Sequence, residues 1–500
     1  MQTATRSEPA TRSTAMSLSN YAGGDWISAT GKSLDVTNPA TGDVLAQAPL
    51  STAGDIDRVV QQAHAAFAAW RATPPLERAR RLFEVKARME AHFEDLARMV
   101  TQEHGKTLDD ARGSTRRAIE SVEVAAGIPS LMMGYGLEDG AARGIDEEVI
   151  KQPLGVFAAI CPFNFPIMVP FWFWPYAVAT GNTFIVKPSE QVPITMTRVF
   201  ELLADGPGRS AAFPPGVLNL VHGDRAAVEA LIDHPLVRGV SFVGSTPVAK
   251  AVYARAAAHG KRVQAQGGAK NMLVVMPDAA MEKTVPNVIG SCFGSAGQRC
   301  LAGSLVITVG AAHDPFVAAL KQAALAMNVG NGLDADVDMG PLISTTAKTR
   351  VAGYVERGVD EGATLVLDGR ESQAAGRGAC FLGPTIFDDV TPDMALARDE
   401  IFGPLVGVVR ADSLDRAIKI IEDSPYGNAA SIFTQSGAAA REFRYRAPVG
   451  NVGINVGVAA PMAYFPFSGA KESFFGTLHA QGRDAIDFYT ERKVVITRWF

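Results

Sequence analysis

Residues 154–188 read LGVFAAICPFNFPIMVPFWFWPYAVATGNTFIVKP, with no charged side chain between Leu154 and Val186. A run of this length could span a bilayer, but four prolines, Gly181 and Asn182 interrupt it. Proline removes a backbone donor and bends helices, and irregular backbone is not tolerated against lipid. The stretch is therefore predicted to form a buried strand, a loop, a buried helix and a second buried strand, and not a membrane span.

Beyond this stretch, short β-rich runs alternate with segments of helix length. GVLNLVHG, GVSFVGS and KNMLVVMP follow it, and a second alternating block starts near Val285 with SLVITVG, ATLVLDG and LVGVVR. Such alternation is typical of parallel, doubly wound sheets covered by helices. Before residue 150, apolar spacing predicts helices from Asp55 as N-cap, over 75–104 and over 114–126.

Composition excludes several classes of protein. The 500 residues suit two to four domains. Forty-seven basic against 52 acidic residues give a net charge of −5, and no dense basic cluster is present, so a nucleic-acid partner is not expected. Four cysteines, at 161, 292, 300 and 380, form no C-x-x-C pair, which argues against a disulfide framework and against a metal site. A reducing, cytoplasmic location fits best.

The N-terminus differs from the rest of the chain. Residues 1–18, MQTATRSEPATRSTAMSL, are rich in Ser, Thr and Ala and are predicted to be a disordered tail. A mitochondrial transit segment is the alternative, which would place the protein in the matrix, but Glu8 and Pro9 weaken it.

One cysteine stands in an unusual context. Cys300 ends the loop GSAGQRC, whose small residues let the backbone approach a ligand, and the adjacent Arg299 could favour a thiolate. Most single cysteines are inert core residues, which describes Cys292 and Cys380 well. A Cys–His hydrolase is one hypothesis, but no histidine has a supporting local pattern.

Nucleotide-binding signals are present but weak. No G-x-G-x-x-G follows a strand. Ser245 precedes Thr246 and Pro247 at a helix start whose free N–H groups suit a phosphate, although most such helices bind nothing. Lys187 lies just past a buried strand, where doubly wound sheets bind ligands, and Glu190 could accept hydrogen bonds from a ribose. Both could equally belong to a solvated loop.

Six motifs in order make these signals specific. They are PFNFP at 162–166, NTFIVKPSE at 182–190, SFVGST at 241–246, GAKN at 268–271, GQRC at 297–300 and EIFGP at 400–404. In these motifs the chain resembles the aldehyde dehydrogenase superfamily from about Tyr21 to the C-terminus. The resemblance implies an α/β fold with a parallel, doubly wound NAD-binding domain (19–134 and 154–271). It also implies an α/β catalytic domain (272–465) and a small β oligomerisation element (135–153 and 480–500) that would build a homodimer or homotetramer.

The resemblance also implies residue roles. Cys300 matches the nucleophile, which would add to an aldehyde and carry a thioester after hydride transfer to NAD. Asn164 matches the amide that, with the N–H of Cys300, holds the oxyanion. A carboxylate at Glu190 favours NAD over NADP. The positions that match cofactor contacts are Cys161, Phe163, Lys187, Glu190, Gln191, Ser245, Gly267, Glu400 and Phe402.

One difference from the hydrolytic members of the family bears on how the thioester is cleaved. Hydrolytic members carry Glu-Leu-Gly-Gly-Lys, whose Glu activates water, whereas this chain has Gln266-Gly267-Gly268-Ala269-Lys270. A neutral amide is not a general base near pH 7. A thiol, which ionises more readily than water, could complete turnover instead, and this points to coenzyme A and an acyl-CoA product.

The methylmalonate-semialdehyde dehydrogenase branch is the most similar, although it usually has Asn-Met where this chain has Gln266-Gly267. Its substrate carboxylate is held by two arginines, matched by Arg299 and by Arg117, beside which stands Arg116. The resemblance implies NAD- and CoA-dependent oxidative decarboxylation of methylmalonate or malonate semialdehyde to propionyl-CoA or acetyl-CoA. A hydrolytic aldehyde dehydrogenase and a catalytically inactive protein on the same fold are the alternatives.

Overall fold

The computed structural model describes residues 16–206, 208 and 210–500. Residues 1–15 of the predicted tail, and with them the transit-segment alternative, lie outside the described residues. Residues 16–18, which the sequence placed in the tail, belong to the folded body. Strand β1 (Met16–Ser17) pairs in parallel with β5 (Val44–Pro49), and Leu18 is buried. Strand β4 (Ser33–Thr37) completes this small sheet.

The first large sheet contains the predicted doubly wound core. Strands β8 to β12 of this sheet are parallel to one another, whereas β2 and β22 pair antiparallel with β10 and β12. The order reverses beside β8, where β9 and β10 continue on one side and β11 and β12 on the other. A reversal of this kind leaves a crevice at the carboxyl ends of the strands, the usual ligand site of such sheets. In spatial order the strands are β22 (Phe474–Phe475), β12 (Arg262–Gln266), β11 (Val237–Val243), β8 (Val156–Ile160), β9 (Thr183–Lys187), β10 (Leu218–Leu220), β2 (Asn20–Ala22) and β3 (Asp25–Ile27).

The charge-free stretch folds as predicted. Strand β8, helices α6 (Met168–Phe171) and α7 (Trp174–Thr180), and strand β9 follow one another, and nearly all their side chains are buried. Burial of each large apolar side chain contributes about 1.5–3 kcal/mol, so this stretch is a main part of the core. No helix among the described residues is long and apolar enough to cross a membrane.

Two helix predictions near the N-terminus need correction. Thr52, not Asp55, is the N-cap of α1. Asp55 is the third residue of the helix and forms a capping box with Thr52, in which the side chain of each residue bonds the backbone N–H of the other. The helix predicted over 75–104 is divided at His92. The helices that pack around the first sheet are α1 (Ala53–Ala72), α2 (Pro75–Ala91), α3 (Phe93–His104), α4 (Leu108–Ala126), α5 (Ile128–Leu131), α8 (Ile194–Leu203), α9 (Arg225–Asp233) and α10 (Thr246–Ala258).

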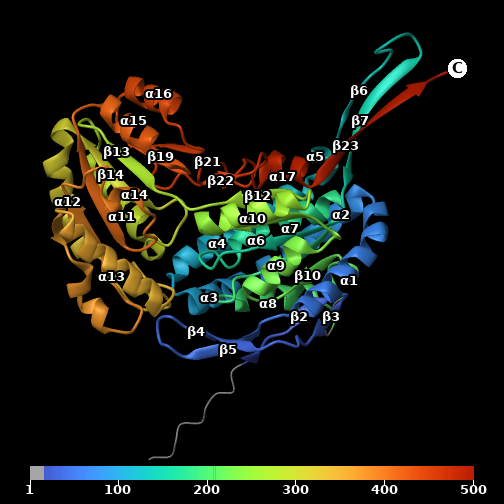
Figure 1. Ribbon diagram of the computed structural model, residues 1–500, viewed down its shortest axis with the longest axis horizontal. Coiled ribbons are helices and arrows are strands. Elements are labelled where there is room, and N and C mark those ends of the chain that lie inside the picture. Colours follow the sequence, from blue (N-terminus) through green and yellow to red (C-terminus); the bar gives the residue numbers. More distant parts are fainter. Residues whose placement is uncertain (1–15, 207, 209) are drawn as a thin grey trace, which may run out of the picture.

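The second large sheet lies beside the first, toward the yellow and orange part of Figure 1. All its neighbouring strands are parallel except β15 and β16. In spatial order the strands are β15 (Thr364–Leu367), β16 (Thr385–Asp388), β17 (Leu405–Ala411), β14 (Gly303–Val309), β13 (Asn271–Val275), β19 (Ala429–Phe433) and β20 (Asn451–Ile454). Its helices are α11 (Met281–Phe293), α12 (His313–Leu325), α13 (Thr345–Asp360), α14 (Ala395–Arg398), α15 (Leu414–Asp423) and α16 (Gly437–Arg446). The short strands β18 (Tyr426–Gly427) and β21 (Ala470–Lys471) pair nearby.

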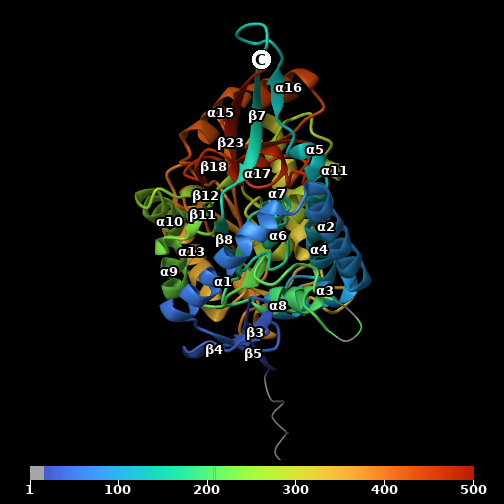
Figure 2. The same ribbon diagram turned by 90° about the vertical axis from the view of Figure 1, so that its right-hand side faces the viewer.

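A third sheet projects from the body as an arm, which Figures 1 and 2 show from two sides. It consists of β6 (Tyr135–Leu137), β7 (Ile145–Pro153) and β23 (Thr490–Arg498), all antiparallel. The predicted oligomerisation element began at residue 480, but helix α17 (Gly482–Phe488) and Tyr489 belong to the body. Tyr489 is fully buried, and its hydroxyl lies 2.9 Å from Ser241 Oγ. The arm therefore starts at Thr490.

Candidate active site

One pocket brings Cys300 together with two arginines. Helix α4 supplies Arg117, the loop before β14 supplies Arg299 and Cys300, and the pocket encloses about 470 Å³ of empty space including its mouth. Most of the remaining wall is apolar, and none of the described residues that line the pocket carries a carboxylate. The other lining residues are Phe165, Met168, Trp172, Leu301, Val458, Ala460, Pro461, Ala463, Phe467 and Gln481.

A strained turn, η1 (Gly294–Gly297), precedes the cysteine. Ser295 and Ala296 have φ of 51° and 54°, which L-residues rarely adopt, and Gly297 follows with φ of 69°. At Gly297 an added Cβ would lie 2.2 Å from the carbonyl oxygen of Gly403. Asp110 holds the turn, since its Oδ2 accepts hydrogen bonds from the Ser295 backbone N–H (3.1 Å) and hydroxyl (3.0 Å).

Two asparagines fix the peptide of Cys300, the predicted nucleophile. The Nδ2 groups of Asn271 and Asn428 both donate to the carbonyl oxygen of Cys300, each at 2.8 Å. Burial raises the pKa of the Cys300 thiol to about 12, Glu400 adds to the increase, and the N–H groups of Cys300 and Leu301 oppose it. The protonated thiol is therefore favoured in this arrangement, and reactivity depends on groups that stabilise the thiolate.

Asn164 lies against the same loop. Its side chain is buried, and Nδ2 donates to the carbonyl oxygen of Gln298 at 3.0 Å. An amide nitrogen carries two hydrogens, so a second donor remains for a developing oxyanion. The backbone oxygen of Asn164 accepts a hydrogen bond from Lys106 Nζ at 2.7 Å.

The two pocket arginines have different partners. Arg299 Nη2 lies 2.6 Å from Asp110 Oδ1, so an internal carboxylate shares its charge, and Arg299 is not available to the thiol as a free cation. Burial works to raise the pKa of Asp110, but Arg299 and Lys106 outweigh it and hold that pKa below its ordinary value. Arg117 Nη1 is 3.3 Å from Glu120. Arg116, the alternative to Arg117, pairs with Glu90 at 2.6 Å and does not line the pocket.

The predicted cofactor residues gather at the crevice of the first sheet. Cys161 follows β8 and donates its N–H to the carbonyl oxygen of Lys187 at 3.0 Å. Lys187 Nζ lies 3.0 Å from Glu190, and Gln191 comes next in the chain. Ser245 is the N-cap of α10, but its side chain makes no capping hydrogen bond, so its hydroxyl is available to a ligand.

Glu400 and Phe402 close the other side of this crevice. Glu400 Oε1 accepts the N–H of Ala269 at 2.9 Å, and burial raises its pKa to about 7. At Gly268 an added Cβ would lie 2.3 Å from Glu400 Oε2, so a side chain there would displace the carboxylate. The ring of Phe402 packs edge-on against that of Phe163, 5.8 Å between centroids. At Gly267 a Cβ would lie 2.7 Å from the carbonyl oxygen of Glu472.

Gln266, at the position of the expected base, supports the pocket wall. Its Nε2 donates to the carbonyl oxygen of Phe467 at 3.1 Å. The ring of Phe467 stacks on Trp172 with centroids 4.3 Å apart, and its N–H donates to the carbonyl oxygen of Ala480 at 2.8 Å. The amide therefore fixes a segment that lines the pocket.

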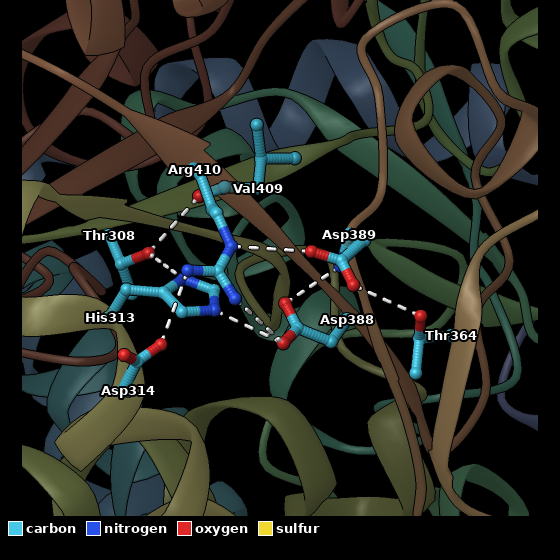
Figure 3. Close-up of polar contacts among 8 residues, drawn as sticks. All are labelled: Thr308, His313, Asp314, Thr364, Asp388, Asp389, Val409 and Arg410. Atoms are coloured by element: carbon cyan, nitrogen blue, oxygen red, sulfur yellow. Dashed lines mark hydrogen bonds and ion pairs between the residues drawn. The ribbon is translucent and has the colours of Figure 1, made fainter.

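A second polar cluster, drawn in Figure 3, has the order hydroxyl, imidazole, carboxylate. Thr308 Oγ1 lies 2.7 Å from His313 Nδ1, and His313 Nε2 lies 3.1 Å from Asp388, which Arg410 also approaches at 3.6 Å. Thr308 is fully buried and lies five residues along β14 from Gly303, about 17 Å at the usual rise of a strand. The cluster ties β14, α12, β16 and β17 together and cannot reach a substrate in the pocket.

Sequence reasoning assigned no role to five residues that hydrogen-bond the backbone or the side chains of the site: Lys106, Asp110, Asn271, Gln298 and Asn428. Asn271 and Gln298 lie in the motifs GAKN and GQRC, which could have pointed to them, whereas no local pattern singled out Lys106 or Asp110. In the described part of the chain, no group of three or more His, Cys, Asp or Glu side chains could hold a metal ion.

Comparison with known proteins bears on the family and on the fold. The model of the aldehyde dehydrogenase family matches residues 26–495. The chain belongs to the aldehyde dehydrogenase family. The predicted α/β fold is thereby confirmed, and this aldehyde dehydrogenase superposes on related crystal structures over nearly all its length.

Two relatives and two solved structures illustrate the similarity. Malonate-semialdehyde dehydrogenase 1 of Geobacillus kaustophilus is 50% identical over 96% of this chain and 98% of its own. The malonate-semialdehyde dehydrogenase of Halalkalibacterium halodurans is 47% identical over 96% of this chain and 98% of its own length. The methylmalonate-semialdehyde dehydrogenase of Oceanimonas doudoroffii superposes with a TM-score of 0.94 at 43% identity, and the match covers 97% of this chain and 99% of the other. A Sinorhizobium meliloti protein, provisionally assigned as a methylmalonate-semialdehyde dehydrogenase and solved with NAD, superposes with a TM-score of 0.94. It is 40% identical, and the match covers 98% of this chain and 99% of the other.

Proposed function

We propose that this aldehyde dehydrogenase converts malonate semialdehyde, methylmalonate semialdehyde or both to acyl-CoA, with NAD as oxidant and loss of CO2. The observation that carries the proposal is the single pocket in which Cys300 meets two guanidinium groups and no carboxylate. Guanidinium binds carboxylates in a bidentate manner, so the pocket suits a short aldehyde that carries an acid group. The names of the relatives at 47–50% identity support the same substrate class.

The residues of the pocket suggest how the first step proceeds. Arg117 and Arg299 would bind the substrate carboxylate and present the aldehyde carbon to Cys300. Attack of the Cys300 thiolate places a negative charge on the carbonyl oxygen, and the free N–H of Asn164 Nδ2 would stabilise it. Because Gln298 already holds the other N–H, the Asn164 amide is oriented before the substrate arrives.

The crevice of the first sheet fits a dinucleotide. Lys187 and Glu190 would hold the adenosine ribose, Ser245 the pyrophosphate, and Glu400 the nicotinamide ribose. A carboxylate beside the adenosine ribose repels the 2′-phosphate of NADP and so favours NAD. The structure of the Sinorhizobium meliloti relative contains NAD. When bound, NAD accepts the hydride from the substrate carbon.

The remaining steps start from the acyl group on Cys300. Its carboxylate is then β to a thioester carbonyl, which can take up the electron pair when CO2 leaves, and the resulting enolate is protonated. Gln266 cannot activate water, because its amide is neutral and bonded to Phe467. The thiol of coenzyme A would lose its proton to solvent and attack the thioester as a thiolate, which releases acyl-CoA and returns the Cys300 thiolate.

The decisive experiment measures NADH formation with and without CoA and identifies the product by mass. Malonate semialdehyde should give acetyl-CoA, and methylmalonate semialdehyde propionyl-CoA, with sustained turnover only when CoA is present. Sustained turnover without CoA to a free acid would support a hydrolytic enzyme and refute the proposal. A Cys300→Ala variant with an unchanged rate would remove Cys300 from the mechanism, whereas a wild-type protein that forms no NADH with any aldehyde would favour the inactive-protein alternative.

We also infer from the projecting arm that the protein forms a homo-oligomer, either a dimer or a tetramer. We further infer a cytoplasmic location, because the relatives are bacterial proteins and this supports the cytoplasm over mitochondria.

A further inference from the structure

A lysine is buried behind the oxyanion site. Lys106 lies between α3 and α4, and only 1% of its surface is exposed. Its Nζ donates to the backbone oxygen of Asn164 at 2.7 Å and lies 3.9 Å from the centroid of the Phe165 ring. Burial of an ammonium group is costly, so its presence at this point requires an explanation.

The second α/β unit holds the backbone of this lysine in place. At Gly340 an added Cβ would lie 1.9 Å from the carbonyl oxygen of Gly105, and at Gly332 one would lie 2.2 Å from that of Lys106. The carbonyl oxygen of Gly332 also accepts the N–H of Leu108 at 2.9 Å. The Lys106 peptide is therefore fixed from one unit while its side chain reaches Asn164 in the other.

Charged and titratable groups face Lys106 from each neighbouring segment. Asp110 on α4 favours its charged form, and Arg299 on the nucleophile loop opposes it. His104 on α3 faces it too, and burial and Lys106 hold the pKa of His104 well below its ordinary value. Burial lowers the pKa of Lys106 to about 7. Lys106 in turn lowers the pKa of Cys300, against the effects of burial and Glu400.

We propose that Lys106 is a positioning residue of the nucleophile: its ammonium group holds the Asn164 peptide beside Cys300, and its positive charge favours the Cys300 thiolate. The inference rests on Cys300 as the nucleophile but not on the identity of the aldehyde or on CoA. It accounts for how a buried thiol ionises in a chain that has Gln266 where hydrolytic members have a basic carboxylate.

The test is alkylation of Cys300 by iodoacetamide, without aldehyde, NAD or CoA, with the modified peptide measured by mass spectrometry. Three variants separate the two roles. Lys106→Arg keeps the charge, Lys106→Gln keeps a donor for Asn164 without charge, and Lys106→Met keeps neither. Wild type should react about tenfold faster than the Gln and Met variants near pH 6, where Lys106 is charged, and the difference should shrink as pH rises through 8. The Arg variant should match wild type near pH 6.

A purely structural role would change the rate by the same factor at every pH. An alkylation profile of folded Lys106→Gln or Lys106→Met parallel to that of wild type would therefore overturn the proposal. The Gln variant, which can still donate to Asn164, decides the matter if the Met variant does not fold. Lys86→Met, which removes a surface ion pair with Glu123, is the matched control and should leave the profile unchanged. Product analysis with CoA tests the proposed function separately.

Discussion

Arg117 and Arg299 come from distant parts of the chain and meet in one pocket. If they bind the substrate carboxylate, replacement of either by Ala should raise KM for malonate semialdehyde by tenfold or more, since a charge-assisted hydrogen bond contributes about 1.5–3 kcal/mol. Propanal, which has no carboxylate, should be affected little. Steady-state kinetics with both aldehydes measure the difference. Arg116→Ala, next to Arg117 but paired with Glu90, is the control, and equal losses for both aldehydes would contradict the carboxylate clamp.

Gln266 leads to a prediction about stability rather than chemistry. Gln266→Met removes the donor to the buried carbonyl oxygen of Phe467 at nearly constant volume, which should lower the free energy of unfolding by about 1–3 kcal/mol. The ratio of acyl-CoA to free acid should stay as in wild type, because no base is lost. Denaturant unfolding and product analysis measure the two quantities. Gln61→Met, on the exposed face of α1, should change neither. A shift of products toward free acid would show that the amide controls deacylation.

The site residues differ in how far sequence could predict them. Cys300 and Asn164 lie in local motifs, so resemblance alone located them. Lys106 and Asp110 act on partners 58 and 189 residues away, and no local pattern encodes such contacts. The pairing of Arg299 with Asp110 likewise depends on how α4 packs against the nucleophile loop, so the sequence indicated a free cation where the structure has an ion pair.

At the scale of elements, Glu103 links the end of α3 to the start of α8. Its carboxylate accepts the N–H groups of Ile194 (2.7 Å) and Thr195 (3.1 Å). Burial raises its pKa to about 7, although these hydrogen bonds oppose the shift. Because the folded state then binds the proton more tightly than the unfolded state, stability should fall as pH rises from about 4.5 to about 7, by up to roughly 3 kcal/mol.

Glu103→Gln should remove this pH dependence, so that its free energy of unfolding changes less than that of wild type between pH 5 and 7.5. Urea unfolding at several pH values gives both curves. Glu138→Gln, an exposed site at the end of β6, should follow wild type. If the Glu103→Gln and wild-type curves run parallel, Glu103 does not titrate in this window.

Element types were predicted better than element ends. The alternating runs located β8 to β11 of the first large sheet and β13, β14, β15 and β17 of the second, since their apolar character reflects burial directly, but they did not include the other strands of these sheets. The ends depend on capping that several residues could provide. Thr107, which caps α4 by accepting the N–H of Asp110, starts that helix at Leu108, six residues before the predicted Ser114. The projecting arm starts at Thr490 and not at residue 480 for a tertiary reason, since Tyr489 is buried in the body beside Ser241.

At the scale of the whole molecule, the pocket is built from one chain, while the arm is exposed on several sides. Large apolar side chains on β23 and at the C-terminus are exposed, among them Val494 (61%), Ile496 (67%) and Trp499 (66%). Strands with exposed apolar side chains and free edges tend to pair with other chains. The arm is therefore the surface that we propose for a second subunit, while all the residues that line the pocket come from one chain.

Val494→Asp combined with Ile496→Asp should therefore dissociate the oligomer, because two carboxylates would be buried without partners in the interface. Light scattering after size-exclusion chromatography should show a smaller mass than that of wild type. KM for the aldehyde should change little at concentrations where the variant stays folded, since Cys300, Arg117 and Arg299 belong to the same protomer. Val359→Asp, at a 48% exposed valine on α13, is the control and should keep the wild-type mass. A double variant with an unchanged mass, or a monomeric wild type, would show that the arm does not hold subunits together.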